Sequence, residues 1–246
     1  MGNGRAGERT VPCLMNLQLP SGPSLSNCRD RLLRFFPNEY AYYDAIQTND
    51  PNHIEPLDIL VTVSMNSRVD TGEKVQKVHR GMAAACDPLL PRIPVDADIL
   101  KFDPDLEVGE SLLSAAISVP GVLSAVATKV LHRKRRNYIP MLDSVVVLFY
   151  LDALHLKSTQ GRLQDKTKAA QATMPAWRAF REDLRANLTE IKALREELVK
   201  GGYVLTPVRI LEVLIWMEAE TRGYYREAKA QGLPANPRLG IAGSSP

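Results

Sequence analysis

The chain has 246 residues, with 31 lysines and arginines against 28 aspartates and glutamates, which gives a formal net charge of +3. This length fits one large domain, and the excess charge is too small to make the whole protein basic. The three cysteines, Cys13, Cys28 and Cys86, form no CxxC pair, so their spacing favours neither a zinc site, nor an iron–sulfur cluster, nor a disulfide scaffold. We therefore expect no metal and no cofactor.

The sequence lacks the features of a membrane or secreted protein. No stretch approaches the roughly 18 uncharged apolar residues of a membrane span, and the first residues lack the apolar core of a signal peptide. We expect a cytoplasmic protein without a membrane partner. Residues 1–25 are rich in Gly, Pro, Ser and Asn without an apolar period and are expected to form a mobile tail, as are residues 229–246.

Apolar periodicity predicts an all-α domain over residues 26–228, with about eight helices. A first helix is expected from Ser26, with an apolar face that stops at Pro37. The segment Ile59–Met65 has the β-branched residues of a strand, but a helix is favoured because no second convincing strand exists to pair with it. Thr71 is expected to cap a helix over residues 73–87.

Five further helices follow in the second half of the chain. Residues 110–119 and 124–135 predict two helices joined by a turn at Pro120-Gly121, and Asp143 or Ser144 is expected to cap a helix over residues 145–156. Pro175 is expected to open a long charged helix that ends at Lys200, before Gly201-Gly202. Thr206 and Pro207 are expected to begin the last strong helix.

The stretch PGVLSAVATKVLHRKRRNYIPMLD, residues 120–143, combines a turn, a helix and most of the local positive charge. Lys129 and the four cations at 133–136 contribute +5 within eight residues, so the remaining chain carries −2. A glycine turn that leads into a helix N-terminus presents backbone N–H groups that bind phosphate well, and nearby cations strengthen such a site. The alternative is a helix connection followed by a solvated cationic helix end.

Asp143 also has two interpretations. Its position before an apolar helical run favours an N-cap, which stabilises a helix by roughly 1 kcal/mol. The same carboxylate, partly desolvated and positioned by its helix, is also able to stabilise a cationic sugar or to activate water. The two roles are compatible with each other.

The order helix, Pro-Gly-Val, helix, apolar link and aspartate resembles the helix–hairpin–helix DNA glycosylase superfamily. Pro120 and Asp143 are separated by the interval that its endonuclease-type members show. The resemblance implies that the Gly121 turn holds a DNA phosphate and that Asp143 assists cleavage between base and sugar. Leu123 replaces the second hairpin glycine, and Ala125 replaces the lysine nucleophile, so the resemblance implies a monofunctional, water-using enzyme.

The same resemblance assigns roles to further residues. Lys129, one turn along the helix, is the second candidate catalytic residue. The remaining candidates would contact phosphate or line a pocket for an extruded base. The phosphate-contacting candidates are His132, Arg133, Lys134, Arg135 and Arg136. The pocket candidates are Tyr40, Tyr43, Tyr138 and Trp216, although Trp216 is more typical of a core residue.

A closer resemblance covers most of the chain. The segments ATKVLHRKRRNYIPMLDSVV and TPVRILEVLIWM resemble an uncharacterised, mainly actinobacterial family with a KLLxRKRPxLxPxxDxVV pattern and a late LxRxLDVxxWM pattern. Asn137 stands in for the proline of the first pattern and Glu212 for the aspartate of the second. This resemblance implies no established activity.

Three hypotheses about function remain after these observations. The first is a helix–hairpin–helix, glycosylase-like enzyme that binds DNA and excises a damaged or modified base. The second is a nucleic-acid-binding protein that keeps the fold but does not excise bases. Leu123, which replaces the second hairpin glycine, is the residue that suggests it. The third is a helical interaction protein in which the HRKRR run is only surface. The sequence assigns no oligomeric state.

Overall fold

The computed structural model describes residues 15–65, 67, 69–156 and 169–230. Within these ranges the chain is mostly helical, which confirms the all-α prediction, but ten α-helices are present instead of about eight. They are α1 (Cys28–Glu39), α2 (Pro56–Val63), α3 (Gly72–Cys86), α4 (Glu107–Ser118), α5 (Ser124–Lys134), α6 (Ser144–Ala153), α7 (Ala169–Ala186), α8 (Leu188–Lys200), α9 (Pro207–Thr221) and α10 (Tyr224–Ala230). Across the described segments, no helix has the length and apolar character to cross a membrane.

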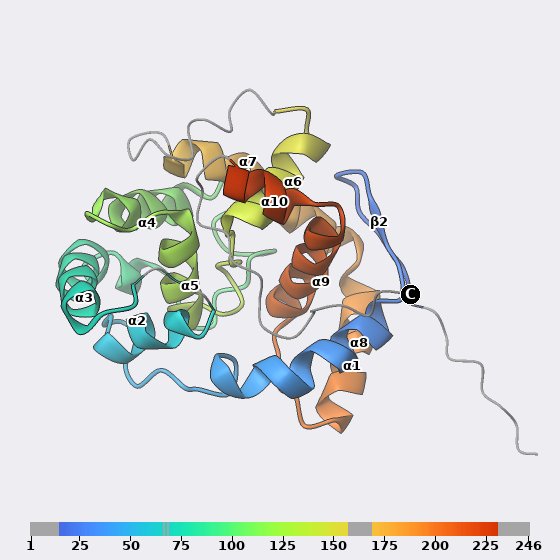
Figure 1. Cartoon of the computed structure of the whole chain (residues 1–246), viewed down its shortest axis with the longest axis horizontal. Helices are drawn as coiled ribbons and strands as arrows, with labels where there is room; N and C mark the ends of the chain where they lie inside the picture. Colours follow the sequence, from blue (N-terminus) through green and yellow to red (C-terminus); the bar gives the residue numbers. More distant parts are fainter. Residues whose placement is uncertain (1–14, 66, 68, 157–168, 231–246) are drawn as a thin grey trace, which may run out of the picture.

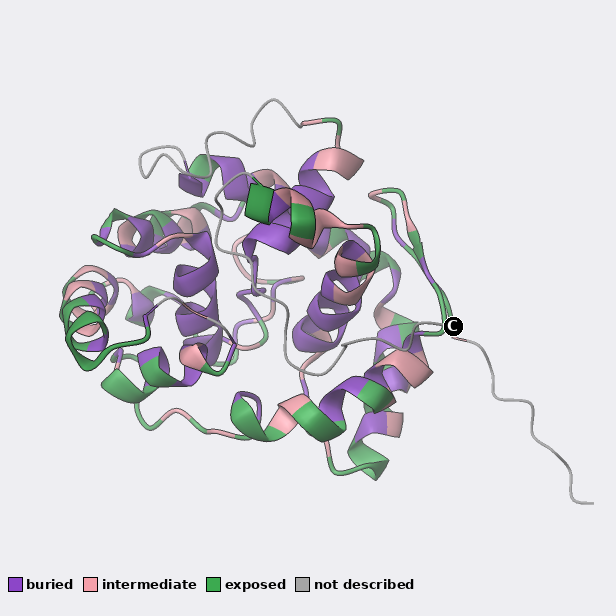
Figure 2. Cartoon of the chain, in the orientation of Figure 1, coloured by how far each residue is buried: buried purple, intermediate pink, exposed green. Residues whose placement is uncertain are grey.

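Helix α5 lies near the middle of the molecule. Helices α2, α3 and α4 lie on one side of it, whereas α1, α8 and α9 form a second group (Figure 1). Helix α7 contacts α4 and α5 on one side and α8 and α9 on the other and so connects the two groups, whereas α6 contacts α7, α9 and α10. One continuous apolar core runs through all of these helices. Every residue of α5 is buried, whereas the outer side of α3 is exposed (Figure 2).

Local capping chemistry sets several helix starts where the sequence predicts them. The Thr71 hydroxyl accepts a hydrogen bond from the Lys74 N–H at 3.3 Å, and α3 follows. The Thr206 hydroxyl accepts from the Arg209 N–H at 3.1 Å, with Pro207 as the first residue of α9. The segment predicted as a helix at 59–65 is helical as far as Val63 and then turns, because α2 begins at Pro56 with a capping box and ends before Ser64.

The prediction of a mobile tail over residues 1–25 is wrong for residues 15–25. Strands β1 (Leu17–Gln18) and β2 (Ser24–Leu25) form a short antiparallel pair whose Leu17 and Leu25 side chains are fully buried. The carboxylate of Asp183 in α7 accepts hydrogen bonds from the Ser21 N–H at 3.0 Å and the Ser21 hydroxyl at 2.7 Å. Contacts from a helix distant in sequence therefore order this segment. Residues 1–14 and 231–246 lie outside the described residues, and α10 continues past 228 to Ala230.

Two prolines lie inside helices that they were expected to end or begin. Helix α1 continues through Pro37 to Glu39, and α7 begins six residues before Pro175. A proline inside a helix costs about 3 kcal/mol. In α7 this cost is offset by burial of the apolar side chains around it, including Trp177 and Phe180. The long helix predicted from Pro175 to Lys200 is also two helices, separated at Asn187.

Candidate functional site

The cations of the HRKRR run lie inside the protein and not on its surface. Arg133, Lys134 and Arg135 are each at most 2% exposed. Arg136 is partly buried. The expectation of a solvent-facing electropositive patch at the end of this helix is therefore wrong. The physical reason is that this helix is central, so its last turn faces protein in every direction.

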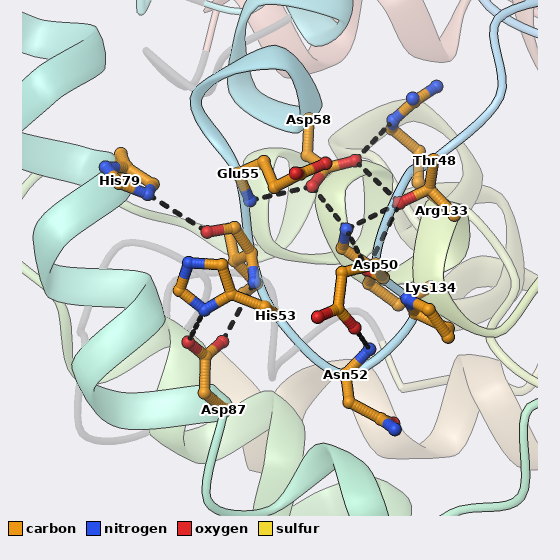
Figure 3. A network of polar contacts seen from close by, with 12 residues as sticks. Thr48, Asp50, Asn52, His53, Glu55, Asp58, His79, Asp87, Arg133 and Lys134 are labelled. Atoms are coloured by element: carbon orange, nitrogen blue, oxygen red, sulfur yellow. Dashed lines mark hydrogen bonds and ion pairs between the residues drawn. The ribbon is translucent and has the colours of Figure 1, made fainter.

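Asp58 in α2 neutralises two of the buried cations (Figure 3). Its Oδ1 atom accepts a hydrogen bond from Arg133 Nε at 2.9 Å, and its Oδ2 atom lies 2.5 Å from Lys134 Nζ. The second carboxylate oxygen also accepts from the Glu55 N–H at 2.9 Å. Because Asp58 is 1% exposed, both ion pairs lie out of contact with bulk water. Such pairs are costly to break because an unpaired buried charge remains.

The other acceptors are mostly main-chain carbonyls of residues 44–52, a segment that we call the anchored loop. Arg133 donates to the carbonyls of Ile46 and Gln47 at 3.2 and 3.1 Å. Lys134 and Arg135 donate to the carbonyls of Asp50 and Pro51 at 2.8 and 2.6 Å. Arg136 donates to the carbonyls of Asp44 and Ile46 at 3.1 and 2.7 Å. The four side chains therefore fix the path of this loop.

A further buried cation, Arg209 of α9, also contacts the loop. Its Nε and Nη2 atoms donate to the two carboxylate oxygens of Asp44 at 2.8 and 2.9 Å, and its Nη1 atom pairs with Glu212. The guanidinium carbons of Arg209 and Arg133 lie 5.6 and 5.7 Å from the centroid of the Tyr43 ring. This arrangement uses Tyr43 as an interior cation–π partner.

The remaining residues of the candidate phosphate and catalytic set on α5 are also internal. Lys129 is 5% exposed, and its Nζ atom donates to the Met65 carbonyl at 2.8 Å. His132 donates from Nδ1 to the Ile139 carbonyl at 2.6 Å, and burial lowers the pKa of its imidazole to about 4. His132 is therefore neutral at physiological pH. Neither side chain is placed to contact a phosphate or a sugar.

Asp143 caps α6, as one of the two interpretations predicts. Its Oδ1 atom accepts hydrogen bonds from the N–H groups of Val145 at 3.0 Å and Val146 at 3.1 Å. The residue is 9% exposed. Its Oδ2 atom accepts no hydrogen bond from any described residue.

Three of the four candidate base-pocket aromatics are buried in the core. Tyr43, Tyr138 and Trp216 are at most 2% exposed, and Tyr40 is partly buried. Each ring contacts a different neighbour: Tyr40 contacts Tyr203, Tyr138 contacts Trp177, and Trp216 contacts Phe35. Tyr43, Tyr138 and Trp216 are therefore core residues, and their burial leaves them no surface for an extruded base.

The turn at Pro120-Gly121 joins α4 and α5 as expected and is accessible. Gly121 has φ +88°, a conformation that favours glycine, and it has open space around the position of a Cβ atom. Leu123, the N-cap of α5, has φ −119° and makes no side-chain cap hydrogen bond. Leu123 therefore does not need the positive φ that a second hairpin glycine would supply.

The sequence interpretation missed the residues that surround this turn. Lys74 and Lys77 of α3, together with Val69, Val78, Pro120 and Gly121, line a pocket of about 370 Å³. A second hollow, of about 670 Å³, is lined by other residues of α3, including His79 and Arg80. The sequence signal for this surface is the spacing of Lys74, Lys77 and Arg80, which places three cations on one side of a predicted helix. This spacing is typical of any solvated helix face and does not by itself indicate a binding site.

These features define a mostly helical protein whose cationic helix end is an internal anchor and in which Lys74, Lys77 and Arg80 of α3 are exposed. A family model described as a family of unknown function, DUF6308, matches residues 31–219, so the chain belongs to that family. This match confirms the expectation of an uncharacterised family. The comparisons with curated proteins and with solved structures gave no match.

Proposed function

We propose that the protein binds nucleic acid through its phosphates, at a surface formed by α3 and the Pro120-Gly121 turn. We call this the α3 cationic surface and define it by Lys74, Lys77, Arg80, Pro120 and Gly121. The observation that carries the proposal is the pocket in which two lysines of α3 face an exposed glycine turn. The proposal keeps the nucleic-acid partner inferred from the sequence but moves the contact away from the HRKRR run.

The charges of this surface are available to a ligand. Lys77 and Arg80 are exposed and form no ion pair with any described residue. Lys74 is exposed and pairs with Asp70 at 2.6 Å, a surface interaction that an incoming phosphate can replace. Residues three apart on a helix are neighbours on its surface, and each step rises about 4.5 Å along the axis. The three cations thus form a short row that matches a charged strand.

The turn contributes backbone groups. At Gly121 no side chain blocks close approach of a phosphate oxygen, because nothing lies within 4 Å of the position of a Cβ atom. The helix α5 that follows has no side-chain cap, so its positive dipole end is not neutralised by an acidic residue. A phosphate in this pocket would contact lysine on one side and main chain on the other.

A second candidate function adds catalysis: excision of a damaged or modified base from DNA, as in the helix–hairpin–helix glycosylases. The observation that favours it is the Oδ2 atom of Asp143, which accepts no hydrogen bond from a described residue, because capping through Oδ1 leaves this carboxylate oxygen for a sugar or a water. Lys129 has no part in this version, because it is buried and donates to a carbonyl.

Binding is tested with short labelled duplex and single-stranded DNA and RNA over a range of salt concentrations. Double charge reversal, Lys77→Glu with Arg80→Glu, should weaken binding and reduce the salt slope by about 2, because each lost phosphate contact removes about 0.9 from it. The matched control is Lys192→Glu with Lys229→Glu, exposed cations of α8 and α10 with the same change of charge. No binding at about 50 mM salt, or equal weakening in both double variants, contradicts the proposal.

Catalysis is tested separately with duplexes that contain uracil, alkylated bases or oxidised bases, and abasic sites are measured. Because Asn caps a helix as well as Asp does, Asp143→Asn keeps the fold and removes only the charge. Excision by the wild type that is lost in Asp143→Asn supports the enzyme. Equal excision by both proteins, or none by either, removes the catalytic candidate.

A further inference from the structure

A histidine oriented by a carboxylate lies at the end of the anchored loop, next to α3 (Figure 3). The Nδ1 atom of His53 pairs with one carboxylate oxygen of Asp87, the residue that follows α3. The other oxygen of Asp87 accepts from the Ile54 N–H at 2.9 Å. Asp87 therefore holds both the ring and the backbone next to it, and this fixes the orientation of the imidazole.

The pairing decides which nitrogen of His53 is available. Because Asp87 accepts the Nδ1 proton, the neutral imidazole carries its lone pair on Nε2. The side chain of His53 is 52% exposed, and its Nε2 atom has no partner among the described residues. A neutral imidazole with a free Nε2 atom, oriented through Nδ1 by a carboxylate, has the arrangement of a general base.

This base lies next to the second hollow on α3. The ring centroids of His53 and His79 are 6.3 Å apart, and His79 lines the hollow with Arg80, Glu73 and Gln76. The Nε2 atom of His79 lies 3.0 Å from the Ile54 carbonyl, which places His79 between the hollow and the His53 segment. Arg80 belongs to both the hollow and the α3 cationic surface. A strand that continues from Arg80 past His79 would reach His53.

We propose that His53 is a general base that cleaves RNA strands bound on the α3 cationic surface, with Asp87 as its positioning residue. This inference rests on the nucleic-acid binding proposed above. RNA is the substrate class because its ribose carries its own nucleophile, the 2′-hydroxyl, so the protein needs to supply only proton transfer and phosphate binding. Arg80, which is exposed and lines the neighbouring hollow, would stabilise the charge that develops on the phosphate.

The reaction is an internal transfer in which no co-reactant is consumed. His53 Nε2 takes the proton of the 2′-hydroxyl, and the 2′-oxygen forms a bond to phosphorus. The bond from phosphorus to the 5′-oxygen breaks, and this leaving oxygen takes a proton from water. His53 then releases its proton to the hydroxide that remains. The products are a 2′,3′-cyclic phosphate and a 5′-hydroxyl.

The test uses the full chain and a labelled single-stranded RNA, with a DNA strand of the same sequence as a substrate that lacks the nucleophile. Wild type should cut only the RNA and leave cyclic phosphate ends. His53→Ala should lower the rate by about 100-fold or more while the Kd for RNA is unchanged, and added imidazole should restore part of the rate. The matched control is His155→Asn, an exposed histidine with φ +57°, a conformation that Asn tolerates.

Asp87→Asn separates positioning from folding. The new amide still accepts from the Ile54 N–H, but its NH₂ group donates to Nδ1, so the His53 proton moves to Nε2, where it blocks the base. We expect kcat to fall with KM unchanged. RNA binding without cleavage, or equal cleavage by wild type and His53→Ala, overturns this inference and leaves the binding proposal intact. The absence of binding to any nucleic acid overturns the binding proposal itself.

Discussion

Replacement of Asp58 by alanine tests whether the HRKRR run is internal. The carboxylate of Asp58 is 1% exposed and pairs with Arg133 Nε at 2.9 Å and with Lys134 Nζ at 2.5 Å. Without it, two buried cations lose their only carboxylate among the described residues. Removal of one partner of a buried ion pair costs about 3–5 kcal/mol. For a chain of this size, each kcal/mol lowers Tm by about 2–4 °C, so Asp58→Ala should lower Tm by roughly 6–20 °C.

The matched control is Asp70→Ala. Asp70 also pairs with a lysine, Lys74, at 2.6 Å, but its side chain is 59% exposed. Because water screens an exposed pair, this variant should leave Tm unchanged within error. Thermal unfolding followed by circular dichroism compares the two substitutions directly. If Asp58→Ala lowers Tm no more than Asp70→Ala does, Arg133 and Lys134 are in contact with water, and the internal assignment of the cationic run is refuted.

Three further predictions concern other residues of the candidate set. Asp143→Ala should destabilise the protein by about 1–2 kcal/mol in urea unfolding, whereas Asp143→Asn should have little effect, because Asn replaces the cap; equal losses would contradict the capping role. Burial lowers the pKa of His132 to about 4 from its ordinary value of 6.5, so the unfolded chain takes up the proton first as the pH falls. Stability should therefore fall by roughly 3 kcal/mol from pH 6.5 to pH 4, in proportion to the 2.5-unit pKa difference, and His132→Asn should lose this component of the slope. Gly121→Ala should cost about 1–2 kcal/mol from backbone strain alone, since the site has open space, and an unchanged Tm would show that the turn relaxes.

Much of the fold follows from local chemistry and is visible in the sequence. Thr71, Asp143 and Thr206 each begin a helix because a side-chain oxygen accepts from an N–H group two or three residues later, a contact that needs no distant partner. The turn at Pro120-Gly121 follows from the same kind of rule. These contacts span so few residues that the rest of the structure does not alter them.

The environment of the cations did not follow from local pattern. Asp58 lies 75 residues before Arg133, and the carbonyls that bind the run belong to a loop more than 80 residues upstream. A run of positive charge has the same sequence pattern whether water or a folded loop solvates it. Whether the run contacts water or a folded loop depends on how α5 is packed, and that packing is set by the tertiary structure. His53 and Asp87 were missed for a similar reason, since 34 residues separate them.

The anchored loop has one more consequence. The side chains of Arg133, Arg135 and Arg136 reach it largely through main-chain carbonyls, and a carbonyl is the same group at every residue type. Ala45 and Gln47 are exposed, and Gln47 contributes to the anchoring only through its main-chain carbonyl. A substitution at either position would thus change what the loop presents to solvent while its path stays fixed. The interior arginines therefore hold the backbone of this segment in place while its exposed side chains are free to vary.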